Sequence, residues 1–269
     1  MSAEIITARN VTKVFGGLTA VDGVNLSVNE KAIYSIIGPN GAGKTTFFNC
    51  LSGYYTPENG DVFYCGQSIR GKGTHEIAAL GILRTYQNIR LFSSLTAIEN
   101  VMVGLHHSLH ETWIDAVLHT RRYQKEEKLA LIQASRWLDF VGLIGCADAA
   151  AGSLPYGAQR RLEIARALAG KPRVLLLDEP TAGMNPQETL EMTTLIRQMR
   201  DDFGITIILI EHDMHVVMEI SDCISVLDFG KKIAEGVPSE IQSNARVIEA
   251  YLGPGGAALA QKFKRKARK

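Results

Sequence analysis

The chain has 269 residues, enough for one large domain or one domain with a sizeable insertion. Apolar residues make up 46% and charged residues 21%, so the chain can form a core and remain soluble. The net charge of +1 is uneven, because the last eight residues hold six cations and the first 261 therefore sum to −5. This mildly acidic body argues against nucleic acid as a partner. The basic end is either a disordered solubilising tail or a segment attracted to anionic lipid.

The sequence contains no candidate membrane anchor. Its N-terminus lacks a charged and then apolar signal segment, and no apolar run approaches the ~20 residues that span a bilayer. The four cysteines have no C-x-x-C spacing, which is typical of reduced, small apolar residues in a cytosolic protein. The cluster of His106, His107 and His110 lacks the other ligands of a zinc site, so a polar helix face is expected there.

The first third of the chain alternates in hydrophobicity as paired antiparallel strands do. Turns are expected at Gly16-Gly17 and Asp22-Gly23, and Asn59-Gly60 is a hairpin signal. The expected strands are 5–8, 11–15, 24–28, 32–37 and 61–65, and the expected helices are 45–53 and 75–80, the second ending at Gly81.

Residues 38–46 read Gly-Pro-Asn-Gly-Ala-Gly-Lys-Thr-Thr, a complete phosphate-binding loop between a strand and a helix. Its glycines allow the φ values at which backbone N–H groups surround an anion, and the helix N-terminus adds about half a positive charge. Lys44 would reach the β- and γ-phosphates, and Thr45 would offer a hydroxyl to Mg²⁺. The expected nucleotide contacts in this loop are Gly38, Asn40, Gly41, Ala42, Gly43, Lys44, Thr45 and Thr46.

From about residue 96 to 150 the sequence indicates an inserted helical subdomain. Thr96 and Glu99 form a capping box, and 118–140 places apolar residues at helical intervals. A further helix with an apolar face runs to about residue 169. Its N-terminus, near Tyr156-Gly157, is a second helix start that could meet an anion.

Buried strands return at 174–177 and 205–210, with a helix at 187–201 between them. Such continuous apolar runs predict parallel strands that are covered on both faces. The first run ends in Asp178 and Glu179, and a position next to the phosphate-loop strand would bring both acids to the carboxyl edge of the sheet. Asp178 can then hold Mg²⁺, directly or through water, and Glu179 can polarise the water that attacks the γ-phosphate.

The second run ends in Glu211-His212-Asp213. His212 would therefore arrive at the same sheet edge as the two acids. There it could hydrogen-bond the γ-phosphate or orient the attacking water. His215, one helical turn later, is expected on the surface.

The order of phosphate loop, Gln87, signature helix, Asp178-Glu179 and His212 resembles the nucleotide-binding subunit of ABC transporters over roughly residues 4–253. The resemblance implies an ATPase with ATP and Mg²⁺ as cofactors. It also implies an α/β fold: a RecA-like P-loop NTPase core with an N-terminal antiparallel β-subdomain and an inserted α-helical subdomain. The implied boundaries are one ABC ATPase domain at 1–252, its core at 1–88 and 166–240, its helical subdomain at 89–165, and a basic, disordered tail at 253–269.

The same resemblance assigns roles to individual residues. Phe15 would stack on adenine, and Gln87 would sense Mg²⁺ and the transmembrane partner. Residues 182–185 would touch an opposite subunit. The implied catalytic residues are Glu179, His212 and Gln87, the implied metal contacts are Thr45, Gln87 and Asp178, and the implied nucleotide contacts of the signature helix are Tyr156, Gly157 and Gln159.

The signature departs from the family pattern, because Pro155-Tyr156-Gly157 stands where Ser-Gly-Gly is usual. Proline has neither a hydroxyl nor an N–H and cannot donate to a γ-phosphate oxygen. Losing a charge-assisted donor would weaken closure by roughly 1.5–3 kcal/mol. The site completed by this signature is therefore predicted to be the weaker of two in an assembled transporter.

Three segments, 156–166, 210–214 and 247–253, are similar to the larger ATPase subunit of importers for branched-chain amino acids, urea or short amides. This implies a second ABC ATPase subunit, paralogous or identical, and two integral membrane permease subunits. It also implies, indirectly, a periplasmic or extracellular substrate-binding protein, and a peripheral position on the cytoplasmic face of the bacterial inner membrane. Two alternatives stay open: a soluble ATPase of the iron–sulfur assembly type, and the ATPase of a lipopolysaccharide exporter.

Overall fold

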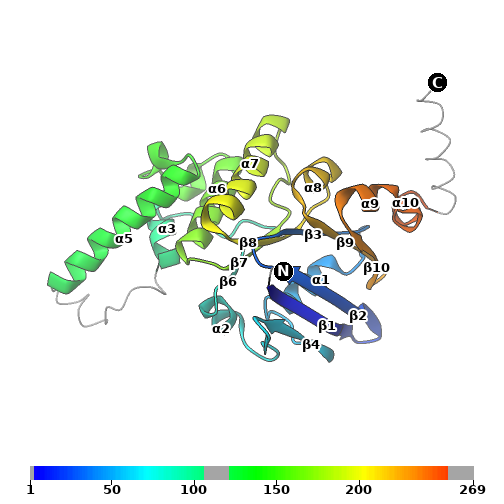
Figure 1. The fold of residues 1–269 in the computed structure, drawn as a ribbon. Coiled ribbons are helices and arrows are strands. Elements are labelled where there is room, and N and C mark those ends of the chain that lie inside the picture. The colour runs from blue at the N-terminus through cyan, green and yellow to red at the C-terminus, as the bar shows by residue number, and fades with distance from the viewer. Residues whose placement is uncertain (1–2, 106–120, 254–269) are drawn as a thin grey trace, which may run out of the picture.

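The computed structural model describes residues 3–105 and 121–253 (Figure 1). The histidine cluster at 106–110 and the basic tail after residue 253 lie outside the described residues. Two β-sheets lie on either side of α1 (Lys44–Leu51), and a helical region extends from one end of the larger sheet. The expected α/β class and both expected subdomains are confirmed.

The larger sheet has the strand order β10-β9-β3-β8-β7-β6. All neighbouring pairs are parallel except β10 and β9, which are antiparallel. The strands are β3 (Ile33–Ile37), β6 (Ile82–Arg84), β7 (Val174–Asp178), β8 (Thr206–Ile210), β9 (Cys223–Asp228) and β10 (Lys231–Gly236). The prediction that the strand ending in the two acids lies next to the phosphate-loop strand is wrong. β8 lies between β3 and β7, so β7 is one position further away.

The smaller sheet is antiparallel, with the order β2-β1-β4-β5. Its strands are β1 (Glu4–Phe15), β2 (Leu18–Asn29), β4 (Asn59–Tyr64) and β5 (Gln67–Ser68). The turn at 16–17 is confirmed, but the turns expected at Asp22-Gly23 and Asn59-Gly60 are wrong, because both pairs lie inside strands. The register shifts near these positions, so each pair belongs to an irregularity that bends a continuous strand.

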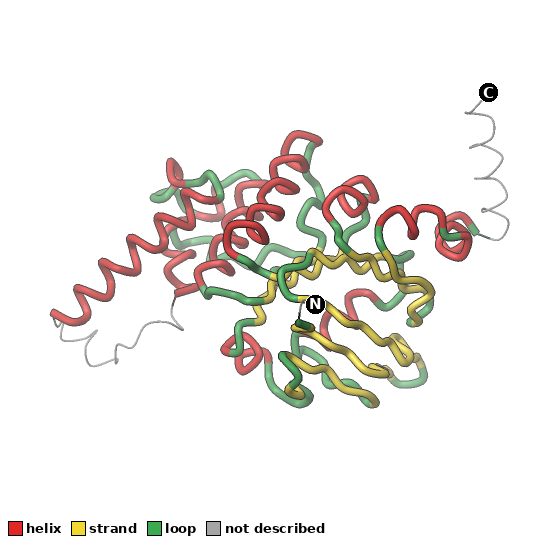
Figure 2. The backbone as a smooth tube through the Cα atoms, viewed as in Figure 1, coloured by secondary structure: helices red, strands yellow, loops and turns green. Residues whose placement is uncertain are grey.

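Capping signals in the sequence mark the starts of α3 and α7, two of the helices drawn in red in Figure 2. Thr96 and Glu99 make the expected capping box ahead of α3. Asn185 caps the start of α7 through the N–H groups of Gln187 and Glu188. Besides α1, the described helices are α2 (Thr74–Ala79), α3 (Ala97–Leu105), α5 (Arg121–Phe140), α6 (Tyr156–Ala169), α7 (Pro186–Phe203), α8 (Met214–Ile220), α9 (Pro238–Ser243) and α10 (Ala245–Leu252). Two 3₁₀ turns, η2 (Ile144–Cys146) and η3 (Ala151–Ser153), lie between α5 and α6.

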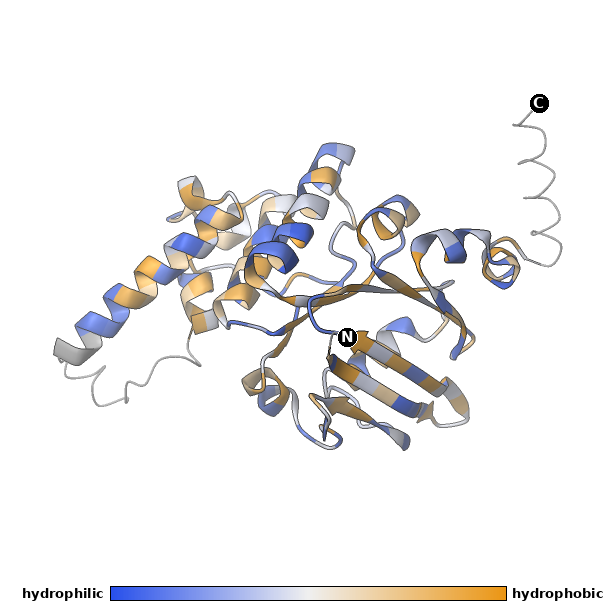
Figure 3. Cartoon of the chain, in the orientation of Figure 1, coloured by the Kyte–Doolittle hydropathy of each residue, from blue (hydrophilic) through white to orange (hydrophobic). Residues whose placement is uncertain are grey.

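Alternate residues of the large sheet enter two different cores, because successive side chains of a strand point to opposite faces. Leu175 and Leu177 pack with the helices α3, α5, α6 and α7, whereas Val174 and Leu176 pack with α1 and the smaller sheet. In the large sheet β7 and β8 are apolar over most of their length, while α5 alternates between apolar and polar residues (Figure 3). Both faces of the sheet are therefore covered, as expected.

None of the described helices is both long and apolar enough to span a bilayer. All four cysteines are free, but only Cys50 is buried, and Cys65 and Cys146 are exposed. All four are therefore unpaired, as expected for reduced cysteines, and Cys50 lies in the core as a small apolar residue.

Candidate nucleotide-binding site

The phosphate-binding loop lies between β3 and α1, at the carboxyl edge of the large sheet. Gly43 precedes α1 with φ +95°, and a Cβ there would come 2.2 Å from the Ala20 carbonyl oxygen. Only glycine fits this position without moving the backbone. Gly43 has no side chain to cap the first N–H groups of α1, which leaves them for an anion.

Lys44 is buried, and its ammonium group is held by the loop itself. Its Nζ donates to the carbonyl oxygens of Gly38 (2.7 Å) and Pro39 (2.9 Å). An ammonium group has three donors, so one remains for a phosphate oxygen. Burial lowers the pKa of Lys44, and the charges of Glu179 and Asp178 oppose this shift. The two acids therefore help to keep Lys44 protonated, as phosphate binding requires.

Asp178, the last residue of β7, is buried and paired with Arg84 at the end of β6. Arg84 Nη2 donates to Asp178 Oδ2 (2.7 Å), and Arg84 Nη1 donates to Asn49 and Ser52 at the end of α1. Arg84 is not among the residues predicted from the sequence. The sequence pattern that could have indicated it is the short run Ile82-Leu83-Arg84, which ends in a polar residue as the other site strands do. Arg84 thus ties the metal-binding candidate Asp178 to the helix that follows the phosphate loop.

Glu179 lies directly after β7 in an unusual backbone conformation, with φ +49°. A residue with a Cβ in this region costs about 1–3 kcal/mol, so surrounding contacts must hold it there. Its N–H donates to the Ile210 carbonyl at the end of β8 (2.9 Å). Its carboxylate has two partners: Gln87 Nε2 lies 3.0 Å from Oε2, and His212 Nε2 lies 2.8 Å from Oε1. The structure therefore brings all three predicted catalytic side chains together.

Glu211 fixes the loops that carry Glu179 and His212 relative to each other. Its Oε1 accepts from the N–H (2.9 Å) and the hydroxyl (2.6 Å) of Thr181, and its Oε2 accepts from the N–H of His212 (3.0 Å). Glu211 is 3% exposed, which makes these contacts a permanent part of the core. No role for Glu211 was predicted, because from sequence a buried acid at a strand end cannot be distinguished from an exposed one.

A cavity of about 740 Å³ opens over the phosphate loop. That volume is in the range of small-molecule sites. Phe15, half-exposed and packed edge-on against Tyr55 at 5.1 Å, forms one wall. The predicted residues that line the cavity are Phe15, Asn40, Gly41, Ala42, Gly43, Lys44, Thr45, Thr46, Gln87, Glu179 and His212, and the residues not predicted are Leu18, Thr19, Ala20, Phe229 and Gly230.

The signature residues Tyr156, Gly157 and Gln159 are not among the residues that line this cavity. Tyr156 is 45% exposed at the start of α6, and Gln159 Nε2 donates to the Leu154 carbonyl of its own segment (2.8 Å). A Cβ at Gly157 would lie 2.8 Å from Glu188 Oε1, the end of a side chain on α7. Pro155 precedes α6 without any side-chain cap, which leaves the first N–H groups of the helix uncapped. Within one chain, therefore, the signature does not complete the nucleotide site.

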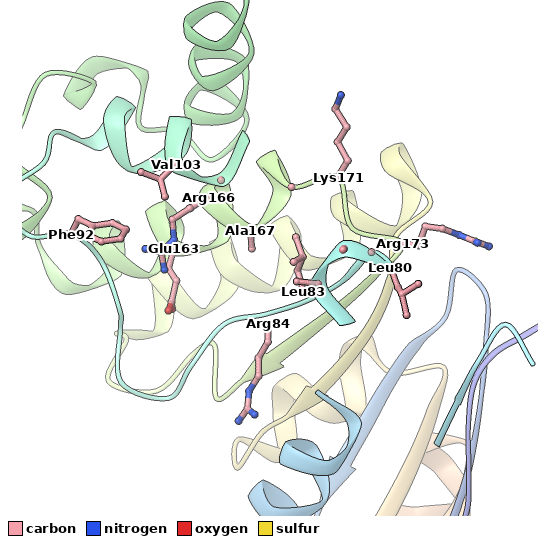
Figure 4. A pocket seen from close by; sticks show the side chains of 15 residues that line it. Leu80, Leu83, Arg84, Phe92, Val103, Glu163, Arg166, Ala167, Lys171 and Arg173 are labelled. Carbon is pink, nitrogen blue, oxygen red and sulfur yellow. The ribbon is translucent and has the colours of Figure 1, made fainter. Parts of the chain in front are cut away.

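A second cavity, of about 620 Å³, lies between α2, α3 and α6 (Figure 4). Leu80, Phe92 and Val103 line it and are partly exposed to solvent. Its charged lining residues are Arg84, Arg166, Lys171, Arg173 and Glu163, so cations predominate. Arg84 points away from Phe92 and Val103, toward α1, so this cavity is connected to the Asp178 pair described above.

Comparisons with known proteins agree with this geometry. The ABC transporter family matches residues 21–182, more than half of the chain, and this stretch contains the phosphate loop, the signature helix and both acids. The chain is a member of the ABC transporter ATPase family. A second match, to the branched-chain amino acid ATP-binding cassette transporter family, covers residues 231–253 of this cassette.

Related transport proteins match almost the whole ABC cassette. The high-affinity branched-chain amino acid transport ATP-binding protein BraF of Pseudomonas aeruginosa is 48% identical over 94% of this chain and 99% of its own length. LivG of Escherichia coli, with the same description, is 45% identical over the same shares. Among solved structures, a nucleotide-free ATP-binding cassette of an ABC transporter has a TM-score of 0.81 at 32% identity, covering 94% of this chain and 100% of that one. The ADP conformation of a cassette gives the same values.

The C-terminal segment of the ABC cassette that matches the second family comprises β10, α9 and α10. β10 pairs with β9 at one edge of the large sheet, and burial raises the pKa of Tyr251 in α10.

Proposed function

We propose that this ABC ATPase binds Mg-ATP in the cavity over the phosphate loop and powers the uptake of branched-chain amino acids through a membrane permease. The nucleotide part rests on the convergence of Lys44, Glu179, His212 and Gln87 on one cavity. The cargo rests on relatives that match 99% of their own length to this chain and are described as branched-chain amino acid transport proteins. Urea and short amides are the second candidate cargo class.

The site chemistry assigns one task to each predicted residue. Glu179 accepts the proton of the attacking water, and His212 and Gln87 orient its carboxylate. Lys44 and the N–H groups at the start of α1 bind the phosphates, and Phe15 offers a ring face to the adenine. Because positioning and charge stabilisation dominate phosphoryl transfer, these contacts would act on the γ-phosphate once the site is closed.

The residues present fit Mg²⁺. The metal prefers oxygen ligands, and it is usually held by one or two carboxylates together with substrate phosphates and water. The Thr45 hydroxyl lines the cavity and supplies such an oxygen, and Gln87 can add its amide oxygen. Asp178 does not line the cavity and is paired with Arg84, so its carboxylate would act through water. In the described residues no group of three or more His, Cys, Asp or Glu is placed to hold a metal ion. Bound there, Mg²⁺ would neutralise charge on the phosphate oxygens.

Closure of the site requires a second ATPase subunit. The signature helix α6 leaves its N-terminal N–H groups uncapped, yet it does not line the nucleotide cavity of its own chain. We therefore assign these groups to the nucleotide of a partner cassette in a head-to-tail dimer, with residues 182–185 at the contact. A related cassette, 26% identical with a TM-score of 0.75, is dimeric with ADP and phosphate bound.

The cationic cavity of Figure 4 is assigned to the permease. Leu80, Phe92 and Val103 offer apolar surface, and Arg166, Lys171 and Arg173 offer positive charge. This combination suits a short amphipathic segment that carries carboxylates. The two permease subunits would hold the chain, as a peripheral protein, at the cytoplasmic face of the bacterial inner membrane, and a substrate-binding protein would deliver cargo from outside.

The transport proposal is tested on the complex that the tagged full-length chain brings out of native membranes. Two permease subunits and a second ATPase are expected, together with ATP-dependent uptake of labelled leucine into proteoliposomes that contain the substrate-binding protein. Labelled urea and acetamide provide the comparison, and a complex with Glu179→Gln provides the inactive control. Uptake of the amides alone would reassign the cargo. Isolation without any integral membrane protein would favour the iron–sulfur assembly type, and lipopolysaccharide release would favour the exporter.

The Pro155→Ser variant is expected to raise ATP turnover of the assembled complex. Serine would supply a hydroxyl to the partner's γ-phosphate and a side-chain cap for α6, and the donor is worth roughly 1.5–3 kcal/mol. Steady-state hydrolysis by the complex, compared with a Ser153→Ala control outside the helix, measures the change. Unchanged turnover would contradict the prediction that this signature completes the weaker of two sites.

A further inference from the structure

A buried ion pair on the signature helix lies directly under the loop that carries Gln87. Arg160 and Glu163 are three residues apart on α6, with side-chain exposures of 0% and 1%, and Arg160 Nη1 lies 2.9 Å from Glu163 Oε2. Burying two charges costs several kcal/mol per ion unless their other hydrogen-bonding groups also find partners. The partners of this pair therefore indicate what it does.

Those partners are main-chain groups of the Gln87 loop. Arg160 donates to the carbonyl oxygens of Tyr86 and Gln87, the second at 2.7 Å. Glu163 Oε1 accepts from the N–H groups of Tyr86 (3.4 Å) and Arg90 (3.3 Å). The guanidinium group thus donates to two carbonyl groups, and the carboxylate accepts from two N–H groups of the same segment. Burial raises the pKa of Glu163, while Arg160 opposes the shift and favours the charged form.

The Gln87 side chain lies on the other side of this loop. It is exposed and donates to Glu179 Oε2 at 3.0 Å, while its carbonyl group is held by Arg160. Residues 86–90 form neither helix nor strand, so no ladder of hydrogen bonds defines their position. The buried pair supplies the main-chain contacts that such a ladder would otherwise provide.

Tyr156 extends the connection to the opposite-subunit loop. Arg160 Nη2 lies 3.3 Å from the Tyr156 hydroxyl, and a Cβ at Gly183 would lie 3.4 Å from the Tyr156 ring. Arg160 therefore contacts both the signature residue Tyr156 and the Gln87 main chain. Tyr156 in turn lies next to the loop at 182–185. An apolar pair could fill the same space without a desolvation penalty, but it could not specify where the main chain of residue 87 lies.

We infer that Arg160 and Glu163 are positioning residues for Gln87. They join the Gln87 main chain to the signature helix, so a displacement of α6 is transmitted to the contact between Gln87 and Glu179. This inference rests on the proposed function, in which Gln87 and Glu179 act on Mg-ATP. Small misplacements of reacting groups can cost about 100-fold in rate, so the pair can change the turnover rate without contacting nucleotide.

Two conservative variants test the role. Arg160→Lys keeps the charge but loses the planar fork that serves two carbonyl groups, and Glu163→Gln keeps an acceptor but removes the ion pair. Each is expected to lower kcat for ATP by about 10- to 100-fold, with KM and nucleotide affinity within about threefold of wild type. Arg161→Lys is the matched control, because Arg161 is partly exposed on the same helix and pairs with Glu191. It is expected to leave kcat within about twofold.

A double-mutant cycle separates positioning from a general structural role. In the Gln87→Ala background, Arg160→Lys and Glu163→Gln should cause little further loss, because their effect passes through Gln87. Equal losses in both backgrounds, or unchanged kcat in both single variants, would overturn the inference. If Arg160→Lys fails to fold, Glu163→Gln and Tyr156→Phe carry the same cycle. Glu179→Gln tests the proposed role of Glu179 as the base separately: its full activity would show that another group activates the water, whatever the pair does.

Discussion

The Glu179→Gln variant is expected to lose ATP hydrolysis by about 10²- to 10⁴-fold and to keep its affinity for ATP. The amide has the shape of the carboxylate but cannot accept the proton of the attacking water. It can still face Gln87 and His212, which lie 3.0 and 2.8 Å from the carboxylate, and it requires no change at φ +49°. The substitution therefore removes the proposed base and little else.

Single-turnover hydrolysis and equilibrium binding of ATP, measured on the same preparation, check this expectation. Glu191→Gln is the matched control, because that carboxylate lies on the surface of α7, where it pairs with Arg161. Hydrolysis by Glu179→Gln within about threefold of wild type would show that another group activates the water. A parallel loss of ATP affinity would instead place Glu179 in substrate binding.

The Lys44→Ala variant is expected to weaken ATP binding by about 10- to 150-fold, which corresponds to the roughly 1.5–3 kcal/mol of a charge-assisted hydrogen bond. Its Nζ also holds the Gly38 and Pro39 carbonyl groups, so the loop loses internal support at the same time. Calorimetric titration with ATP and Mg²⁺, under conditions in which no hydrolysis occurs, measures this loss of affinity. Lys128→Ala, an exposed position on α5, controls for the loss of one positive charge.

The pH dependence of wild-type binding gives a second measurement of the same contact. Burial lowers the pKa of Lys44, so its ammonium group loses the proton at lower pH than an ordinary lysine. Only the charged form attracts phosphate strongly. ATP affinity should therefore be complete below this lowered pKa and decline as the pH rises through it. Lys44→Ala should lack that decline, and a wild-type affinity that is flat over the alkaline range would argue against a direct phosphate contact.

Local signals were sufficient for the elements that carry the site. The phosphate loop, the strand that ends at Asp178 and the strand before His212 were all predicted from motifs and apolar runs. Each depends on residues that are close in sequence, and glycine positions, strand patterns and helix starts are local properties. The same locality explains the misplaced turns near Gly23 and Gly60, because a bend inside a long strand uses the same residues as a hairpin turn.

Triphosphate binding follows from local sequence, because one nine-residue loop contains the glycines, the lysine and the threonine of the site. The folded structure sets how the remaining groups meet. It placed β8 between β3 and β7, and it paired Arg84 with Asp178, 94 residues apart, and Arg160 with the Gln87 carbonyl, 73 residues apart. Such pairings depend on strand order and on which charges become buried. Burial is a property of the assembled core, so no short stretch of sequence specifies it.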